Sequence, residues 1–547
     1  MIKRFLSLLC VLALCLGLLP VTALAADGIE LYVGGQRITE SGCYANQDGT
    51  WTKVEGTGPS SGQFYYNAAT ATLTLNGATI QGGTSTGSVP YGAGIYAQCK
   101  DSESVSLTIE LIGNNTITGY YGIYVNAEIS ENSNGTDASL TITGENNVSL
   151  EVSGSFYGIF VKSGTGNASV TIKNASVDAK TTQTNSGYAG VCVQSGASSK
   201  DSPNLSLAVN GGSLTTSGSA SGDGIQFVVG AHVATRATTS LTVTDNAIVD
   251  ARNGGISASR TSVTLPTPTP TGNNSSGIVF DDKNGTVYGK VELQEDITIN
   301  EGETLTVGKD ASLNTGSHEV IVNGGTLNGA DKIMGTVKYA PTITTQPQDV
   351  EVKENETATF TVNAIGSDLS YQWQQSTNKG SSWTNIDSAT SNTYTTGQTT
   401  MDMSGTQYRC VVKNSVKEVT SNTATLTVTA IPTYEITVQT DGHGTASASS
   451  TTAKAGEQIT LTATPNSGYR FAGWTSSNGG SFADASSAST TFTMPDRNVT
   501  VTANWKKKSS GGSVFFWDLK FDTNGGSKIN TVTEWEYSTI DLDEYVP

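Results

Sequence analysis

The hydrophobic positions in the first half of the chain recur as a short strand that begins with glycine. The copies read Gly94-Ile95-Tyr96-Ala97, Gly122-Ile123-Tyr124-Val125, Gly158-Ile159-Phe160-Val161, Gly190-Val191-Cys192-Val193, Gly224-Ile225-Gln226-Phe227, Gly255-Ile256 and Gly277-Ile278-Val279-Phe280. Six intervals cover the 183 residues from Gly94 to Gly277, a mean of about 30 residues. Self-similarity at such a period predicts a solenoid.

A second strand recurs between these copies, with polar and apolar residues in alternation. Its copies are Ser106-Leu107-Thr108-Ile109, Ser139-Leu140-Thr141-Ile142, Ser169-Val170-Thr171-Ile172, Leu205-Ser206-Leu207 and Ser240-Leu241-Thr242-Val243. Asn or Gly follows each copy, and these residues supply the positive φ that sharp corners need. We therefore predict an all-β fold that opens with a right-handed parallel β-helix, whose coils bury their inward residues against each other.

The solenoid pattern weakens toward residue 341. Residues 284–340 keep short apolar strands but lose the leading glycine, which is typical of terminal coils. The proline-rich segment 266–270 cannot donate to a central ladder, so we expect it in an excursion loop.

After Pro341 the pattern changes to that of an immunoglobulin-like β-sandwich. Trp373 is expected in the core, and Tyr408 stands two residues before Cys410, as in a tyrosine corner. Val362 occupies the place of the partner cysteine, so Cys410 is predicted to be a buried thiol without a bridge.

A third unit, with an aromatic core of Tyr469, Phe471, Trp474 and Trp505, completes the predicted organisation. A flexible linker follows it, and a similar unit then begins without its aromatic strand. The boundaries we assign are 1–25 for a signal peptide, 26–341 for the β-helix, 342–430 for the Ig-like domain, 432–506 for a small β repeat, 507–517 for the linker and 518–547 for a partial second repeat.

The first residues predict export. Lys3 and Arg4 precede an apolar run that ends in the small-residue sequence Ala23-Leu24-Ala25, which is typical of a signal peptide cleaved after Ala25. No later stretch has the roughly 20 apolar residues of a membrane-spanning helix. We expect a secreted chain without a membrane span.

Charge and cysteine content narrow the choice of partners. The net charge of −18, without a basic patch before Lys506, disfavours nucleic acid as a partner, because phosphates must be neutralised by Lys and Arg. Cys43, Cys99, Cys192 and Cys410 are far apart and lack CxxC spacing, so neither a disulfide framework nor a zinc site is predicted. Cys99 and Cys192 fall on opposite phases of their strands and should not pair.

Three stretches resemble known modules. Residues 65–80, YYNAATATLTLNGATI, are similar to the opening of carbohydrate-binding-type β-helix domains in modular surface proteins of Gram-positive gut bacteria. The segments around Trp373 and Tyr408 resemble bacterial immunoglobulin-like domains, and residues 434–505 resemble the divergent internalin-type B repeat. The resemblance implies a cell-surface or cell-wall adhesin or carbohydrate-binding scaffold, whose partner is a glycan or a host or cell-wall surface ligand.

Strand alternation points to a candidate binding site. If Ile and Val of the glycine-led strands face inward, Tyr96, Tyr124 and Phe160 face outward on successive coils, about 4.8 Å apart. Such a ladder could stack on sugar rings. The alternative is a face that loops cover, or aromatic rings that have no ligand.

The alternative function is a β-helix polysaccharide lyase or glycoside hydrolase. These enzymes need a proton-abstracting base or paired carboxylates. Asp281, Asp282 and Lys283 form the one compact charged cluster of the solenoid, and a solvated turn also explains them. The histidines stand alone in sequence. We therefore predict a binding protein and not an enzyme, with no catalytic residues, no metal site and no cofactor.

Overall fold

The computed structural model describes residues 29–83, 92–99, 104–127, 136–145, 148–184, 187–196, 202–219, 222–230, 237–259, 264 and 276–508. The predicted signal peptide, the 266–270 loop, most of the linker and the partial second repeat lie outside these ranges. The described chain is all-β, as predicted, apart from two single-turn 3-10 helices and an isolated helical position. None of the described helices is long and apolar enough to cross a membrane.

The first described residues form antiparallel strands before the repeats begin. Strand β1 (Ile29–Val33) pairs antiparallel with β2 (Gln36–Ile38) and with β8 (Ala93–Cys99). Strands β3 (Gly42–Gln47), β4 (Thr50–Val54), β5 (Gln63–Asn67) and β6 (Thr72–Asn76) follow as antiparallel neighbours. Phe64 packs between the rings of Tyr44 and Trp51, with centroids 5.0 and 4.8 Å away. This aromatic cluster belongs to the same buried core as the first repeats.

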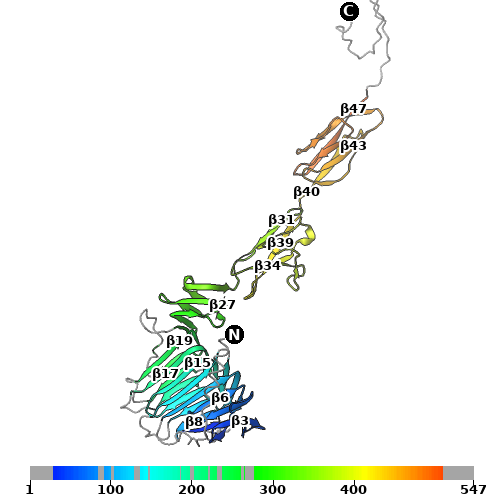
Figure 1. Cartoon of the computed structure of the whole chain (residues 1–547). Coiled ribbons are helices and arrows are strands. Elements are labelled where there is room, and N and C mark those ends of the chain that lie inside the picture. The colour runs from blue at the N-terminus through cyan, green and yellow to red at the C-terminus, as the bar shows by residue number, and fades with distance from the viewer. Residues whose placement is uncertain are drawn as a thin grey trace, which may run out of the picture. The chain divides into compact units, whose positions relative to one another are not determined.

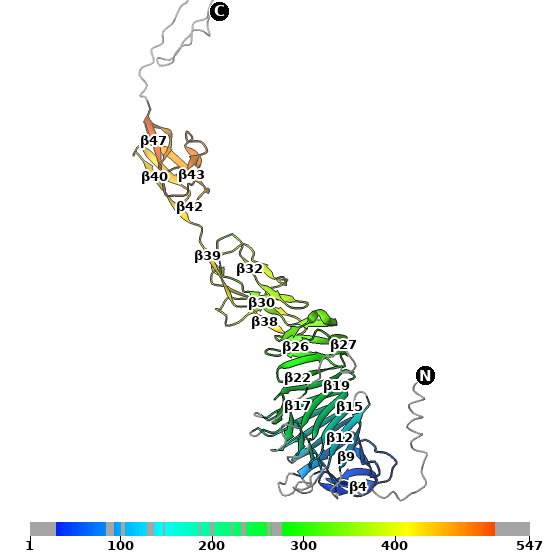
Figure 2. The same cartoon turned by 90° about the vertical axis from the view of Figure 1, so that its left-hand side faces the viewer.

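From β6 onward, strands of successive repeats pair in parallel and form three stacks (Figures 1 and 2). The glycine-led stack consists of β8, β11 (Tyr121–Asn126), β14 (Ile159–Ser163), β16 (Val191–Ser195), β18 (Ile225–Val229) and β21 (Ile256–Ser259). The second stack consists of β6, β9 (Val105–Ile112), β12 (Ala138–Gly144), the first halves of β15 (Ala168–Thr181) and β17 (Asn204–Ser217), and β19 (Thr238–Thr244). The third stack consists of β7 (Thr79–Gln81), β10 (Asn114–Gly119), β13 (Ser149–Gly154), the second halves of β15 and β17, β20 (Ala247–Asn253) and β22 (Gly277–Asp281).

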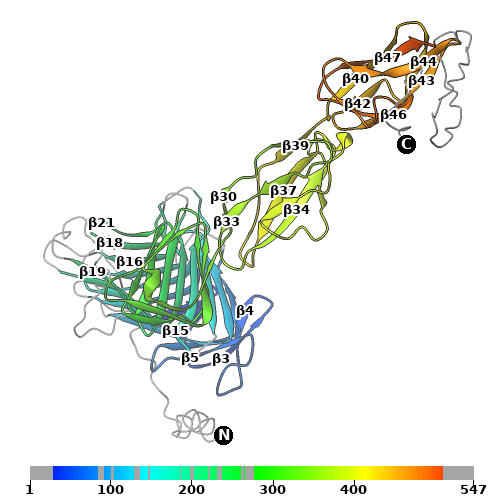
Figure 3. The same ribbon diagram turned by 90° about the horizontal axis from the view of Figure 1, so that it is seen from above.

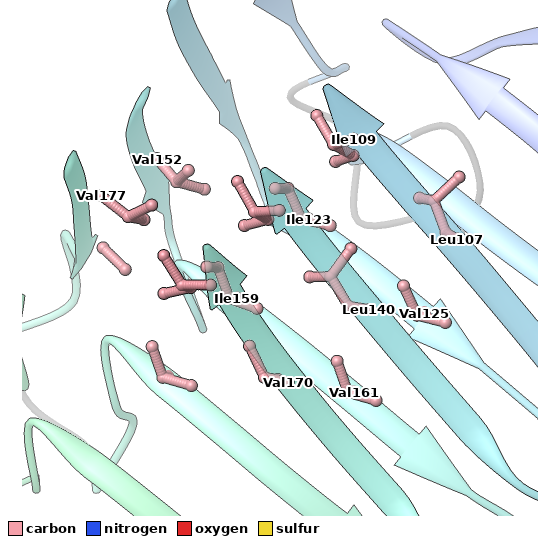
Figure 4. Packing of buried hydrophobic residues seen from close by; sticks show 14 of the residues in the cluster. Leu107, Ile109, Ile123, Val125, Leu140, Val152, Ile159, Val161, Val170 and Val177 are labelled. Carbon is pink, nitrogen blue, oxygen red and sulfur yellow. The ribbon is translucent and has the colours of Figure 1, made fainter. Parts of the chain in front are cut away.

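The interior between the stacks is a set of aliphatic ladders. In the second stack the aligned positions are Leu107, Leu140, Val170, Leu207 and Leu241. All five are buried, and Figure 4 shows side chains of neighbouring strands meeting in this interior. Full burial stabilises each such side chain by about 1.5–3 kcal/mol. The alternation read from the sequence therefore assigned the inward face correctly.

The leading glycines serve close packing and not a left-handed backbone. None of the five glycines that lead strands of this stack between residues 94 and 224, all within the described ranges, has a positive φ. A Cβ on Gly122 would lie 2.4 Å from Val152 Cγ1 and 2.5 Å from the Gly158 carbonyl oxygen. The positive φ that the sequence predicted occurs at the corner between the second and third stacks, at Gly77, Gly113, Asn174, Gly211 and Asp245.

The strand that begins at Gly277 is not a further copy of the glycine-led stack, contrary to the sequence prediction. Strand β22 pairs in parallel with β20 of the third stack and then antiparallel with β23 (Asn284–Tyr288). The glycine-led stack ends at β21 in the described chain, and β16, β18 and β21 follow one another along one side in Figure 3. The hairpin at Asp282, whose φ is +51°, reverses the chain direction.

The last strands of this region form a smaller sheet with its own core. Strand β27 (Ser312–Asn323) pairs in parallel with β24 (Lys290–Glu292), β25 (Ile297–Asn300) and β29 (Ile333–Tyr339). Its buried side chains, such as Ile299, Leu313 and Val320, pack with Phe280 in a cluster separate from the first.

Residues after 342 form an Ig-like arrangement. Strand β31 (Val350–Lys353) pairs in parallel with β39 (Ala424–Thr429), which pairs antiparallel with β37 (Gln407–Lys413). Strand β32 (Thr359–Thr361) pairs antiparallel with β36 (Thr393–Thr395). Trp373 and Tyr408 are buried, as predicted, and the Tyr408 ring stacks on Phe360 at 4.6 Å.

The prediction that the cysteines are unpaired is also confirmed. Cys43, Cys99, Cys192 and Cys410 are free and buried. Val362 is fully buried, and Cys410 forms no bridge. Burial raises the pKa of the Cys410 thiol to about 11, so this thiol is protonated and unreactive at neutral pH.

The repeat module consists of two four-stranded sheets. Strand β47 (Val499–Lys507) pairs with β40 (Thr433–Thr440) and β44 (Tyr469–Ser476), and β43 (Gln458–Pro465) pairs with β41 (Gly444–Ala448) and β46 (Ser489–Thr493). Trp474 and Trp505 are buried in its core, and Tyr469 and Phe471 pack against it while partly exposed.

Candidate functional site

The three rings of the predicted aromatic ladder lie in contact with one another in a row. Tyr96, Tyr124 and Phe160 occupy the same position on β8, β11 and β14. The Tyr96 and Tyr124 ring centroids are 5.2 Å apart, and those of Tyr124 and Phe160 are 4.7 Å apart. Cys192 continues the row on β16. Because Ile95 and Ile123 beside them face the interior, these rings lie on the other side of the sheet.

The ladder is covered, which corresponds to the alternative of a covered face. Tyr96, Tyr124 and Phe160 are only 3%, 7% and 7% exposed. Tyr121 lies 4.9 Å from Tyr124, and Tyr157 stacks on Phe160 at 4.7 Å. Burial accordingly raises the pKa of the Tyr124 hydroxyl. These three rings offer no open face to a sugar. They pack instead against the aromatic rings that cover them, Tyr121 and Tyr157.

A second aromatic row lies at the corner that precedes the glycine-led strands. We call Tyr120, Phe156 and Tyr188 the corner aromatics. The centroids of Tyr120 and Phe156 are 4.2 Å apart, and those of Phe156 and Tyr188 are 4.4 Å apart. All three are partly exposed. The Phe156 backbone N–H donates to the Tyr120 carbonyl at 2.9 Å, so successive repeats stay in register here.

The corner aromatics were not predicted from the sequence, although they recur at a fixed position in the repeat. Each stands two residues before a repeated glycine: Tyr120 before Gly122, Phe156 before Gly158 and Tyr188 before Gly190. The periodic position was visible, but a corner residue has no strand alternation from which its direction can be predicted.

A groove of about 270 Å³ opens beside Tyr120. Its wall contains Gln81, Thr118, Ser153, Ser155 and Thr182, together with the glycines 82, 83 and 119. Backbone bonds hold this wall together: Gly82 donates to the Thr118 carbonyl at 2.7 Å, and Ser155 donates to the Gly119 carbonyl at 3.0 Å. The groove combines one aromatic ring with hydroxyl and amide groups.

The acidic cluster at residues 281–283 is a turn. Asp281 Oδ1 accepts a hydrogen bond of 2.7 Å from the Ile256 backbone N–H, and Asp282 and Lys283 are exposed at the hairpin. This geometry corresponds to the turn interpretation of the cluster.

A charged cluster that the sequence did not reveal surrounds Arg252. Its guanidinium binds Asp250 at 2.6 Å, Glu303 at 2.9 Å and the Thr298 carbonyl at 2.6 Å, and it lies over the Phe280 ring. The hydrogen bond with Asp250 is the main reason why the pKa of Arg252 is raised. Because both carboxylates bind one cation, the arrangement connects β20 to the strands after it. Among the described residues, no group of three or more His, Cys, Asp or Glu side chains is placed to hold a metal ion.

Two family profiles match parts of the chain. The divergent InlB B-repeat domain matches residues 434–509, and a domain of unknown function (DUF8696) matches residues 337–430. No curated protein matches the chain.

Solved structures similar to this chain include immunoglobulin-like domains. They are DIP-gamma IG1+IG2 (21% identity, 18% of this chain and 50% of that chain, TM-score 0.14), a chimeric titin Z1Z2 functionalised with a KLER exogenous peptide from decorin (29%, 17% and 97%, 0.14) and titin domain M7 (28%, 18% and 100%, 0.15). The match spans half of the first and nearly all of the other two. This chain is a modular all-β protein that combines Ig-like and bacterial repeat domains.

Proposed function

We propose that the protein is a secreted cell-surface adhesin or carbohydrate-binding scaffold. In this proposal the three stacks wind as a right-handed parallel β-helix that forms the binding head, and the Ig-like and repeat modules form its stalk. The binding partner is a glycan of a host or cell-wall surface.

The observation that carries the proposal is the groove beside the corner aromatics. A partly exposed tyrosine next to hydroxyl and amide groups suits a ligand that has both an apolar face and polar edges, as sugar rings do. The parallel stacking places these groups on successive strands, where an extended polymer can contact several repeats. The resemblance of residues 65–80 to carbohydrate-binding-type domains supports the same proposal.

We propose binding without catalysis. A hydrolase needs two carboxylates placed on either side of the bond to be cut. Asp250 and Glu303 are instead both bound to Arg252, and Asp281 accepts a backbone hydrogen bond in a turn. These contacts support a structural role for the described acidic clusters.

The extracellular location is part of the proposal. The signal-peptide pattern at residues 1–25 supports export, and the internalin-type repeat at residues 434–509 is compatible with a surface protein. We propose that the protein remains associated with the cell wall or cell surface.

The test is a glycan array probed with residues 26–547, with and without calcium. We expect retention on a defined set of glycans that does not depend on calcium, since the groove contains no carboxylate. Absence of binding to every glycan would contradict the proposal.

A further inference from the structure

One polar row runs along the groove wall across three successive coils. Gln81, Thr118 and Ser153 are aligned neighbours on β7, β10 and β13. The residues before them, such as Ile117 and Val152, are buried in the interior core. Since successive side chains of a strand point to opposite faces, the row faces outward into the groove.

Tyr120 lies beside this row, directly after its middle strand, β10. It lines the groove, while Phe156 packs beside its ring at 4.2 Å and Tyr121 at 5.6 Å. Two aromatic neighbours restrict the orientation of the ring. Because the side chain is already ordered, it loses less conformational entropy when a ligand stacks on it. In the described part of the chain, no side-chain hydrogen bond involves Gln81, Thr118 or Ser153, so their polar groups remain available for a ligand.

The charge of the groove restricts the ligand further. None of its nine described lining residues is ionisable near neutral pH. The next residue in the row is Lys180, aligned with Ser153, but its ammonium group already binds Glu151 and lies 3.8 Å from Asp178. With a net charge of −18 on the chain, an acidic polymer would be repelled without a cation to receive it.

We infer that this groove is the binding site for a neutral polysaccharide, with one sugar ring stacked on Tyr120 and the hydroxyls of the chain bonded to Gln81, Thr118 and Ser153. The inference rests on the proposed function and specifies its site and ligand class. Hydroxyl groups and the Gln81 amide both donate and accept, which suits the hydroxyls of a sugar. The lack of a cationic side chain in the groove and the negative charge of the chain exclude a uronic-acid polymer from this site.

The experiment is affinity gel electrophoresis of residues 26–547 in gels that contain mannan, mixed-linkage β-glucan, xyloglucan or polygalacturonate. The variants are Tyr120→Ala, Tyr120→Phe and the double variant Thr118→Val with Ser153→Ala. Tyr65→Ala is the matched control, because Tyr65 is also a partly exposed tyrosine of this region but lies on β5, outside the groove. Thermal unfolding of each variant checks that it is folded.

We expect retardation by at least one neutral polymer and none by polygalacturonate. Tyr120→Ala should weaken binding by about tenfold or more, as loss of an interface anchor does. Tyr120→Phe, which keeps the ring, and Tyr65→Ala should bind within about twofold of the unaltered protein. The double variant should weaken binding while leaving the aromatic packing intact, so it tests the site even if Tyr120→Ala does not fold.

Two results would overturn the inference while leaving the proposed function in place. One is binding of a neutral polymer that neither Tyr120→Ala nor the double variant changes, and the other is binding of polygalacturonate alone. Absence of retardation by all four polymers, together with an array on which no glycan is retained, would overturn the proposed function itself.

Discussion

Gly122 shows how one residue type can recur for a reason that its sequence does not reveal. A Cβ at this position would collide with Val152 and the Gly158 carbonyl, because the glycine-led strand lies close to the third stack and to the next repeat. Repetition of the glycine was evident in the sequence, but the cause could be identified only from the three-dimensional neighbours. Close approach, and not backbone conformation, accounts for this position.

Gly122→Ala should therefore destabilise the stacked region by about 1–3 kcal/mol, the usual cost of overpacking. The added Cβ would meet Val152 Cγ1 at 2.4 Å. Gly58→Ala is the matched control, because Gly58 has no positive φ and a Cβ there would meet nothing within 4 Å. Urea unfolding measures both variants, and equal losses of stability would contradict the packing explanation.

Tyr408 gives a prediction about alkaline pH. Burial raises the pKa of its hydroxyl to about 12, above the value of about 10 for an unfolded chain. Its contribution to stability is complete below pH 10 and is lost as the pH rises toward 12, because the unfolded chain releases the proton first. Between pH 9 and 11.5 the urea midpoint of the Ig-like domain should fall further for the unaltered protein than for Tyr408→Phe. Parallel pH profiles would show that Tyr408 is not responsible.

At the scale of strands, the sequence predicted the face of the sheet on which a side chain lies better than it predicted the residues that pack against that side chain. Alternation placed Leu140 in the interior and Tyr124 on the other side correctly, because the direction of a side chain on a strand follows from its parity. It could not show that Tyr121 and Tyr157 cover Tyr124 and Phe160, since both lie at the junction of a corner and a strand. The sequence of β22 is similar to that of the glycine-led strands, yet β22 pairs with a strand of the third stack, because a strand motif does not specify its pairing partner.

The inward ladder predicts that substitutions at two adjacent residues differ strongly in the stability that they cost. Leu140→Ala should cost about 2–5 kcal/mol, because Leu140 is fully buried between Leu107 and Val170. Thr141→Ala, the neighbouring substitution on the partly exposed face, should cost less than about 1 kcal/mol. Denaturant unfolding of both variants is the measurement, and a small effect of Leu140→Ala would contradict the interior assigned here.

The Arg252 cluster connects strands that are distant in sequence. Arg252→Met should lower stability by roughly 2 kcal/mol, because Asp250 and Glu303 lose the charged donor that they share. Arg37→Met is the control, since Arg37 pairs with Glu30 while half exposed, and such surface pairs contribute about 0–1 kcal/mol. Thermal unfolding at low and high salt distinguishes the two, and equal effects would show that the Arg252 cluster is an ordinary surface pair.

At the scale of the whole molecule, the sequence predicted the all-β class and the Ig-like and repeat modules, and the details of the site came from the structure. Trp373, Tyr408 and Cys410 identified the Ig-like unit because its core requires large buried residues at fixed strand positions. The two tryptophans of the repeat module were predictable for the same reason. The groove was not predictable, because it is formed by residues from three repeats whose proximity depends on the register of parallel pairing.

The most direct test of a binding head without catalysis is to follow polysaccharide chain length while the protein is bound. Residues 26–547 are incubated with the neutral polymer that retards them most strongly, and new reducing ends are measured over a day with and without calcium. The account predicts a bound complex and no increase in reducing ends above the protein-free control. Steady release of oligosaccharides would contradict it and would identify the protein as an enzyme.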